Sequence, residues 1–155
     1  MHQISDYRAH QHYGPLIAER VWTAWWQESG FALSNVVGHM EEMADARPLP
    51  TALVAHDADG YAGSAFIIDC DLDERPQYTP WIAALWVEEN RRNHGIGTDL
   101  LRAAAKTAGE LGYKTAYLCC HRDLESFYAK NGWSVLEQDV GDHDLTVMTH
   151  KFEAS

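Results

Sequence analysis

The sequence is short of basic residues and of long apolar runs, and each shortage excludes a class of protein. Lysine and arginine number 12 against 23 aspartate and glutamate residues, which gives a formal net charge of -11. A field of that sign repels phosphate backbones, so we expect no nucleic-acid partner, whereas cations such as amines are attracted. No apolar stretch approaches the roughly 18 residues of a transmembrane helix, so we expect no membrane partner.

Cysteine is also sparse, with Cys70, Cys119 and Cys120 in the whole chain. Adjacent residues of a strand point to opposite faces, so Cys119 and Cys120 would face apart, and we expect no disulfide framework. Residues 1–6 have neither the basic start nor the apolar stretch of a secretion signal. Together these features predict a soluble, cytoplasmic protein.

Two histidines near the N-terminus are the one pattern that suggests a metal. His10 and His12 stand two residues apart, which on a strand would place both imidazole rings on one face. No cysteine or carboxylate completes the set at a spacing typical of a metal site. We therefore expect no metal.

The composition is that of an ordinary globular protein. With 46% hydrophobic and 23% charged residues, a chain of 155 residues predicts a single domain over residues 1–155. The apolar patterns predict strands at residues 3–8, 51–56, 61–69, 80–87, 115–120, 133–137 and 145–152, and helices at 14–30, 36–43, 96–111 and 124–130. A strand–helix–strand crossover among these elements favours an α/β domain with a mixed sheet.

The segment between the strand at 80–87 and the helix at 96–111 has the features of a phosphate cradle. The first amides of a helix lack internal partners, and the helix dipole places partial positive charge there. Gly95 and Gly97 would let the backbone approach an anion closely, and Arg91 and Arg92 add charge. A glycine turn with two solvated arginines would carry the same short pattern.

Two motifs in order give a more specific signal than the turn alone. Arg92, Gly95 and Gly97 match R-x-x-G-x-G directly after an apolar strand, and Phe127-Tyr128 followed by Gly132-Trp133 comes later in the chain. With these motifs, residues 81–133 resemble the GNAT superfamily of acetyl-CoA-dependent N-acetyltransferases. The resemblance implies an acyltransferase fold with a mixed, mostly antiparallel central sheet and helices on both faces.

The resemblance also implies acetyl-CoA as co-substrate and a set of residues that hold it. The strand before the motif would splay from its neighbour and pair with the pantetheine arm through the backbone of Leu85, Trp86 and Val87. Backbone amides would hold the pyrophosphate at Arg92, Asn93, His94, Gly95, Ile96, Gly97 and Thr98. Where many family members carry an asparagine that contacts the coenzyme, this chain has His121, which can also donate a hydrogen bond.

The same resemblance places a general acid at Tyr128, since many members have a tyrosine near the coenzyme's sulfur. A phenol can protonate a departing thiolate without being charged at neutral pH. A helix aromatic packed on the core is the alternative for this residue. For the general base, Glu88 is the first candidate, with Asp69, Asp71 and His39 as weaker ones. An amine of modest pKa could also lose its proton to bulk water.

Aromatic residues supply candidates for an acceptor pocket, because aromatic faces receive cationic amines. Tyr78, Trp81 and Trp86 lie on or beside the strand at 80–87, and Trp26 lies off the apolar stripe of the first helix. Trp81 and Trp86 are five positions apart, so a regular strand would point them to opposite sides. Core packing is an equally good explanation of all four.

We therefore expect an N-acetyltransferase that moves acetyl directly from acetyl-CoA to a primary amine. A small-molecule acceptor is favoured over a protein, because nothing resembles a peptide-docking extension. Acetylation of a protein N-terminus or lysine stays open, as do a non-catalytic acyl-CoA-binding sensor or scaffold domain and a dimeric interaction protein that uses exposed tryptophans. A homodimer also stays open.

Overall fold

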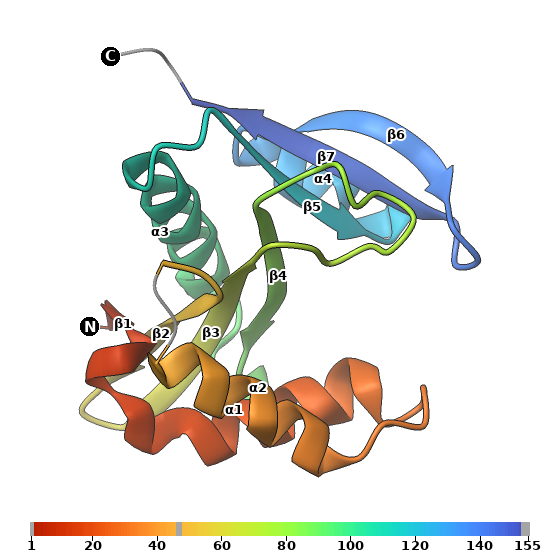
Figure 1. The fold of residues 1–155 in the computed structure, drawn as a ribbon. Helices are drawn as coiled ribbons and strands as arrows, with labels where there is room; N and C mark the ends of the chain where they lie inside the picture. The colour runs from red at the N-terminus through yellow and green to blue at the C-terminus, as the bar shows by residue number, and fades with distance from the viewer. Residues whose placement is uncertain (1, 46–47, 153–155) are drawn as a thin grey trace.

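The computed structural model of the protein describes residues 2–45 and 48–152. Its strands form one seven-stranded sheet in the order β1-β2-β3-β4-β5-β7-β6 (Figure 1). Neighbouring strands are antiparallel except β4 and β5, which run parallel. This confirms the predicted mixed, mostly antiparallel sheet. The strands are β1 (Gln3–Asp6), β2 (Thr51–Asp57), β3 (Gly60–Ile68), β4 (Trp81–Val87), β5 (Thr115–Cys120), β6 (Ser134–Val140) and β7 (Leu145–Lys151).

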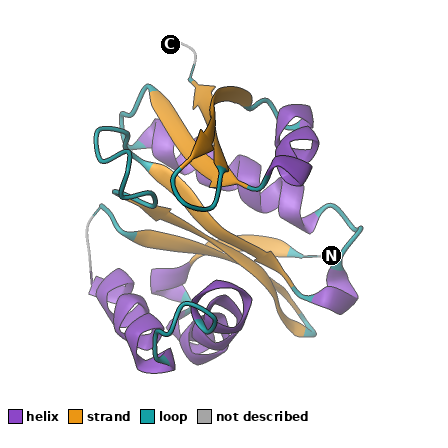
Figure 2. Ribbon diagram, turned by 90° about the vertical axis from the view of Figure 1, so that its right-hand side faces the viewer, coloured by secondary structure: helices purple, strands orange, loops and turns teal. Residues whose placement is uncertain are grey.

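Helices cover both faces of the sheet, as Figure 2 shows with the strands as a layer between them. One face packs on α1 and α2 through a cluster that includes Ile17 and Met40. The other face packs on α3 and α4 through a cluster that includes Leu100 and Phe127. The helices are α1 (Gly14–Val21), α2 (Leu33–Asp45), α3 (Ile96–Glu110) and α4 (Glu125–Lys130).

The central elements lie close to where the sequence predicts them. The hairpin of β2 and β3, the apolar strand β4, the long helix α3 and strand β5 all form. Gly60 and Gly112 adopt φ angles of 99° and 98° at the turns that follow β2 and α3. Only glycine adopts that left-handed region without a steric cost, so these two residues fix where the elements end. At the other end of the chain, β6 runs to Val140 rather than to residue 137, through irregular pairing with β7.

The first predicted strand is wrong in its last two residues. β1 stops at Asp6, whose Oδ1 accepts the Arg8 amide at 2.8 Å and so caps a 3-10 turn at Tyr7–Ala9. A second 3-10 turn follows at Gln11–Tyr13, so His12 is not on a strand. Within the described residues, no group of three or more His, Cys, Asp or Glu side chains is arranged to hold a metal ion.

The predicted helix at 14–30 is divided in the structure. After α1, residues Trp22–Trp26 form a π-helical turn in which the Gln27 amide donates to the Trp22 carbonyl at 2.8 Å. The chain reverses at Gly30, with a φ of 84°. α2 then begins earlier than predicted, because the Asn35 side chain accepts the Ala32 amide at 2.9 Å and stabilises the start of the helix. No helix in the described residues combines the length and the apolarity needed to cross a membrane.

Candidate active site

The connection from β4 to α3 leaves the start of a long helix open. After a 3-10 turn at Glu89–Arg91, Asn93 and Gly95 adopt φ angles of 68° and 81°, and α3 begins at Ile96. Among the described residues no side chain caps the helix, and a Cβ at Gly95 would meet nothing within 4 Å. The first amides of α3 thus lack a capping side chain there, and the binding of an anion by them stays a prediction.

The two arginines of this connection have different partners. Arg91 pairs with Asp57 at the end of β2, so the charge of Arg91 is neutralised locally. The exposed Arg92 donates from Nε to the Val87 carbonyl at 2.9 Å, and its guanidinium lies 4.7 Å from the centre of the Trp86 ring. Arg92 is therefore the arginine that carries positive charge to the open start of α3.

Strands β4 and β5 separate near the start of β4, ahead of this connection. Their pairing joins Trp81 to Tyr117, and the Tyr117 amide donates to the Pro80 carbonyl at 3.0 Å. Beyond that point β4 continues to Val87 while β5 pairs only with β7 on its other side, up to Cys120. Figure 1 shows the two strands diverging. The later residues of β4 thus keep backbone groups that no strand satisfies on that side.

A β-bulge in β4 corrects one prediction. Opposite β3, Ile68 pairs with Trp81 and Ser64 pairs with Trp86, with a register shift between them. Ala84, inside the bulge, has a φ of 53°. Directly paired residues share a face, and Ser64 and Ile68 are an even number apart on β3. Trp81 and Trp86 therefore point to the same face of the sheet, not to opposite faces.

Tyr128 lies in α4 beside the gap between β4 and β5. Its ring meets the Phe127 ring edge to face, with centroids 5.1 Å apart, and packs on the core cluster of α3. Burial raises the pKa of the Tyr128 phenol, and the neighbouring Cys120 and Cys119 raise it further. The phenol is thus protonated at neutral pH. His121 is exposed at the end of β5.

Glu88, the first candidate for a general base, is held by an arginine. Its Oε1 and Oε2 accept from Arg20 Nε at 2.8 and 3.1 Å, and the Glu88 side chain is only 16% exposed. This ion pair ties the end of β4 to α1. Arg20 would compete with a substrate proton for the carboxylate of Glu88. The role of Glu88 as a base therefore stays a prediction.

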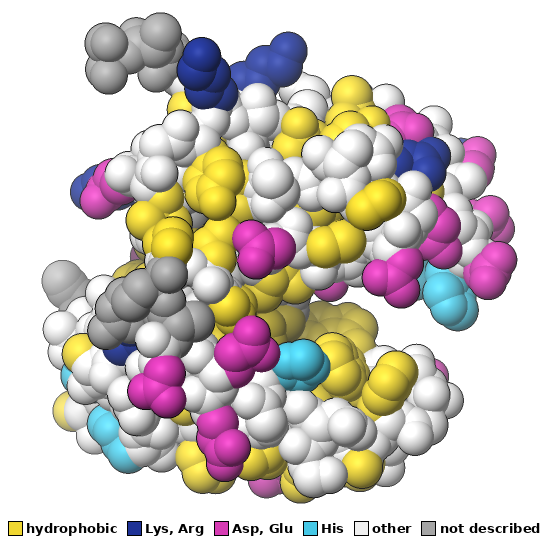
Figure 3. All heavy atoms as spheres, in the orientation of Figure 1, with side chains coloured by type: hydrophobic (Ala, Val, Ile, Leu, Met, Phe, Trp, Pro, Cys, Tyr) yellow, Lys and Arg dark blue, Asp and Glu magenta, His cyan; other side chains and the backbone are white. Residues whose placement is uncertain are grey.

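On the face of α1 and α2, Figure 3 shows a cleft between the helices below and the sheet's C-terminal half above, with hydrophobic side chains inside it. Trp25, 45% exposed, meets Trp86 edge to face at a centroid distance of 6.4 Å. Trp26 packs between Phe31 and His39, at 5.1 and 5.3 Å. Of the three tryptophans predicted to matter, Trp26 and Trp86 are partly open. Trp26 was selected from the tryptophans of the first predicted helix, whereas the structure also places Trp25 against Trp86.

The predicted acceptor contacts at Tyr78 and Trp81 belong to an aromatic wall that is largely closed. Tyr78 stacks on Tyr117 with centroids 4.6 Å apart, and its hydroxyl donates to Glu137 at 2.8 Å. Trp81 is 0% exposed, and its Nε1 donates to the Tyr78 carbonyl at 2.6 Å. Trp81 is therefore a core residue that packs beneath Tyr78 and Tyr117, and it does not reach the surface of the cleft.

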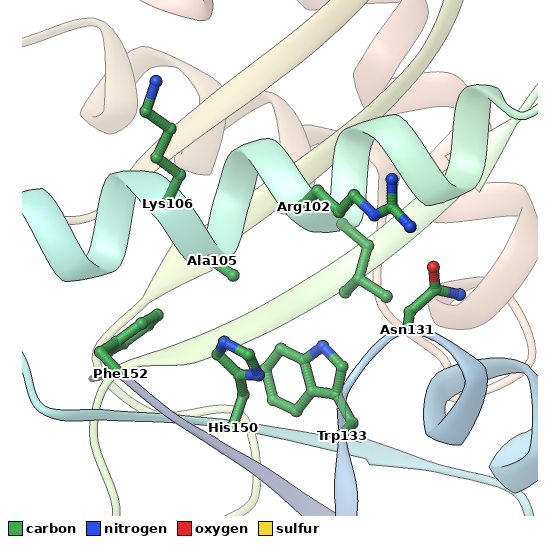
Figure 4. A pocket seen from close by; sticks show the side chains of 8 residues that line it. Arg102, Ala105, Lys106, Asn131, Trp133, His150 and Phe152 are labelled. Carbon is green, nitrogen blue, oxygen red and sulfur yellow. The ribbon is translucent and has the colours of Figure 1, made fainter.

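A second hollow lies on the opposite face, between α3 and the C-terminal strands (Figure 4). The rings of Trp133 and His150 lie side by side on its floor, with centroids 5.5 Å apart, and Phe152 closes one end. Arg102 and Asn131 stand at the other end, while Lys106 points away from the rings. None of the predicted site residues lines this hollow. The gap between β4 and β5 is therefore the candidate active site.

Comparison with known proteins identifies the family. A family model described as an acetyltransferase (GNAT) domain matches residues 48–135, more than half of the chain. No curated protein gives a significant match.

Solved structures share the fold over nearly the whole chain. A GNAT family acetyltransferase from Staphylococcus aureus Mu50 is 16% identical with a TM-score of 0.72, over 99% of this chain and 100% of that one. An aminoglycoside 6'-N-acetyltransferase complexed with coenzyme A is 19% identical with a TM-score of 0.76, over 99% and 98%. An aminoglycoside 6'-acetyltransferase type Ii is 22% identical with a TM-score of 0.74, over 99% of each chain. With the family model matched and the fold shared, the protein belongs to the GNAT family of acetyltransferases.

Proposed function

We propose that the protein binds acetyl-CoA and transfers its acetyl group to a primary amine of a small molecule. The observation that carries this proposal is the separation of β4 from β5 along the strand that leads to the uncapped start of α3. A thioester with a long polar arm and a diphosphate needs both features, in that order along the chain. One of the similar structures was solved in complex with coenzyme A, which agrees with such a site.

The residues around the gap fit the coenzyme. The backbone of Leu85, Trp86 and Val87, where β4 has moved away from β5, would pair with the pantetheine arm. The amides at the start of α3 would hold the pyrophosphate, with the exposed Arg92 adding positive charge beside them. When bound there, acetyl-CoA supplies an activated acetyl group.

Groups of the protein then orient the acetyl group and transfer a proton to the leaving thiolate. The β4 backbone next to the bulge fixes the position of the bound acetyl group, which raises its effective concentration relative to the amine. Tyr128, kept neutral by burial, donates a proton to the thiolate that leaves. The amine would approach from the face of the sheet that carries Trp25, Trp26 and Trp86, the face covered by α1 and α2.

A small amine is the acceptor class that we favour. Two of the similar structures are of aminoglycoside acetyltransferases. The aromatic lining of the cleft and the net charge of -11 both favour a cationic ligand. A peptide amine is the competing acceptor, and the test below includes it.

Coenzyme binding and turnover test the proposal in two steps. Coenzyme A should raise the melting temperature, because a ligand at 100 times its Kd stabilises the folded state by about 2.7 kcal/mol. Thiol release from acetyl-CoA is then measured with small mono- and polyamines, amino sugars, and peptides with a free N-terminus or lysine. We expect release with small amines. Absence of both stabilisation and release would overturn the proposal, and release with peptides alone would overturn the acceptor class.

A further inference from the structure

Asp71 is an acidic side chain that the loop after β3 brings onto β5, at the gap. Its Oδ2 accepts a hydrogen bond from Cys119 Sγ at 3.3 Å, although the two residues are 48 positions apart in the chain. Cys119 is two residues beyond Tyr117, the last position at which β5 pairs with β4. The Asp71 carboxylate therefore stands beside the point where the two strands have just separated.

Asp71 and Tyr128 approach this gap from opposite faces of the sheet. Cys119 packs with Tyr117 in the cluster on the cleft side, whereas Tyr128 packs in the cluster of α3 on the other side. Cys119 nevertheless lies close enough to Tyr128 to raise the pKa of the Tyr128 phenol. An acid and a carboxylate are thus placed on either side of the position predicted for the thioester.

The other well-placed carboxylates on this side are already bound to cations. Glu88 is held by Arg20, as described above. Glu137 accepts from Arg75 Nε at 2.9 Å and also from the Tyr78 hydroxyl, and both contacts lower its pKa. In the described part of the chain, the side-chain partner of Asp71 is a neutral thiol instead. Asp71 is exposed, so a substrate can reach it.

We infer that Asp71 is the group that binds the acceptor ammonium and takes its proton, an inference that rests on the proposed function. An N–H bond of the ammonium breaks and its proton passes to the Asp71 carboxylate. The freed amine nitrogen forms a bond to the acetyl carbon, the carbon–sulfur bond breaks, and the thiolate takes the proton of Tyr128. The second proton of the nitrogen restores the phenol, and Asp71 releases its proton to water.

The surroundings of Asp71 suit this role. Protein atoms crowd the carboxylate although it stays open to water, and this desolvation raises its pKa to about 6, with a smaller raising effect from Asp73. The thiol hydrogen bond from Cys119 acts in the opposite direction. Cys119 from β5 and Asp73 from the same loop are the titratable groups that act on Asp71. A base is most effective when its pKa lies near the working pH.

The pH profile of kcat/KM tests the assignment. For the wild type we expect kcat/KM to fall on the acidic side of the profile as the Asp71 carboxylate becomes protonated. We call this fall the acidic limb. Asp71→Asn should lower kcat/KM by roughly 100-fold or more and abolish that limb. The matched control is Asp73→Asn, which keeps the plateau rate. Coenzyme A should still raise the melting temperature of each variant, which shows that the fold and the coenzyme site are intact.

Variants that leave Asp71 in place keep the test sharp even when Asp71→Asn does not fold. Asp73→Asn should move the acidic limb to lower pH, because it removes a negative charge that raises the Asp71 pKa. Cys119→Val should move the limb to higher pH, because it removes the hydrogen-bond donor that lowers it, whereas Cys119→Ser keeps a donor. A merely structural role for Asp71 would produce no such pair of opposite shifts.

The outcomes separate this inference from the proposed function. An active wild type whose acidic limb survives in Asp71→Asn, or does not move in the other variants, overturns the role of Asp71 alone. A wild type that binds no coenzyme A and releases no thiol with any amine overturns the proposed function and this inference with it.

Discussion

At the scale of single residues, packing sets the protonation state of Tyr128. The phenol sits against Phe127 and beside two cysteines, so its proton is held tightly at neutral pH. Replacing Tyr128 by Phe keeps the ring and removes only the proton donor. We expect kcat to fall by roughly 100-fold with coenzyme binding unchanged. Steady-state kinetics and the melting temperature with coenzyme A measure the two effects, and an unchanged kcat would leave Tyr128 a packing residue.

Asp71 connects the proposed chemistry with stability. Its folded-state pKa, about 6, lies above the ordinary aspartate value of 3.8, so the folded protein binds this proton more tightly than the unfolded chain does. The stabilisation from the bound proton is therefore complete below about pH 4, falls as pH rises through 6, and is absent above that.

Asp71→Asn should consequently have a higher melting temperature than the wild type at pH 8 and a similar one at pH 4. The neutral amide avoids the cost of a crowded charge and can still accept the Cys119 hydrogen bond. Thermal unfolding at both pH values measures this, with Asp73→Asn as the exposed neighbouring control. A variant less stable than wild type at pH 8 would contradict it. The expected gain would also show a site where function is kept at some cost in stability.

At the scale of elements, the end of β4 depends on close approach of β3. A Cβ at Gly63 would lie 2.6 Å from the Trp86 carbonyl oxygen and 3.3 Å from Val87 Cα. Because these are backbone atoms, they cannot move aside without displacing the part of β4 that is predicted to hold the pantetheine arm. Gly38, in α2, has nothing within 4 Å of the same added atom.

This pair of glycines gives a matched prediction. Gly63→Ala should destabilise the protein by about 1–3 kcal/mol through overpacking and should weaken coenzyme binding. Gly38→Ala should stabilise it by about 0.5–1 kcal/mol, since alanine favours helix more than glycine. Urea unfolding and coenzyme titration measure both variants. Equal effects at the two positions would show that β3 and β4 tolerate the extra atom.

At the scale of the whole molecule, charge favours a cationic acceptor. The net charge is -11, and Figure 3 shows acidic side chains around the upper rim of the cleft. Asp142 and Asp144, in the turn between β6 and β7, are exposed. Such a field raises the local concentration of cations and is screened by salt, with a Debye length of about 10 Å at 0.1 M and about 3 Å at 1 M.

For a polyamine acceptor, kcat/KM should therefore fall as ionic strength rises, and it should fall more steeply than for a monoamine. The two substrates are measured under saturating acetyl-CoA at several salt concentrations, so that coenzyme binding does not contribute. The monoamine is the internal control. Identical slopes would show that the negative field does not reach the acceptor.

The sequence by itself determined the elements that depend on neighbours in the chain. The run from an apolar strand through Gly95 to α3 forms as predicted, because apolar periodicity selects the element and glycine permits a φ of 81° where the chain turns. The opposite faces of Cys119 and Cys120 follow equally locally: Cys120 lies in the α3 cluster and Cys119 in the cleft-side cluster. These patterns also sufficed for the family.

Only the tertiary structure decided which distant groups meet. The bulge that turns Trp81 and Trp86 to one face arises from the register between β3 and β4, which period-two counting cannot show. The hold of Arg20 on Glu88 and the contact of Asp71 with Cys119 join residues 68 and 48 positions apart. Proton affinity depends on desolvation and on charges within a few ångströms, and those are set by packing between elements rather than by order along the chain.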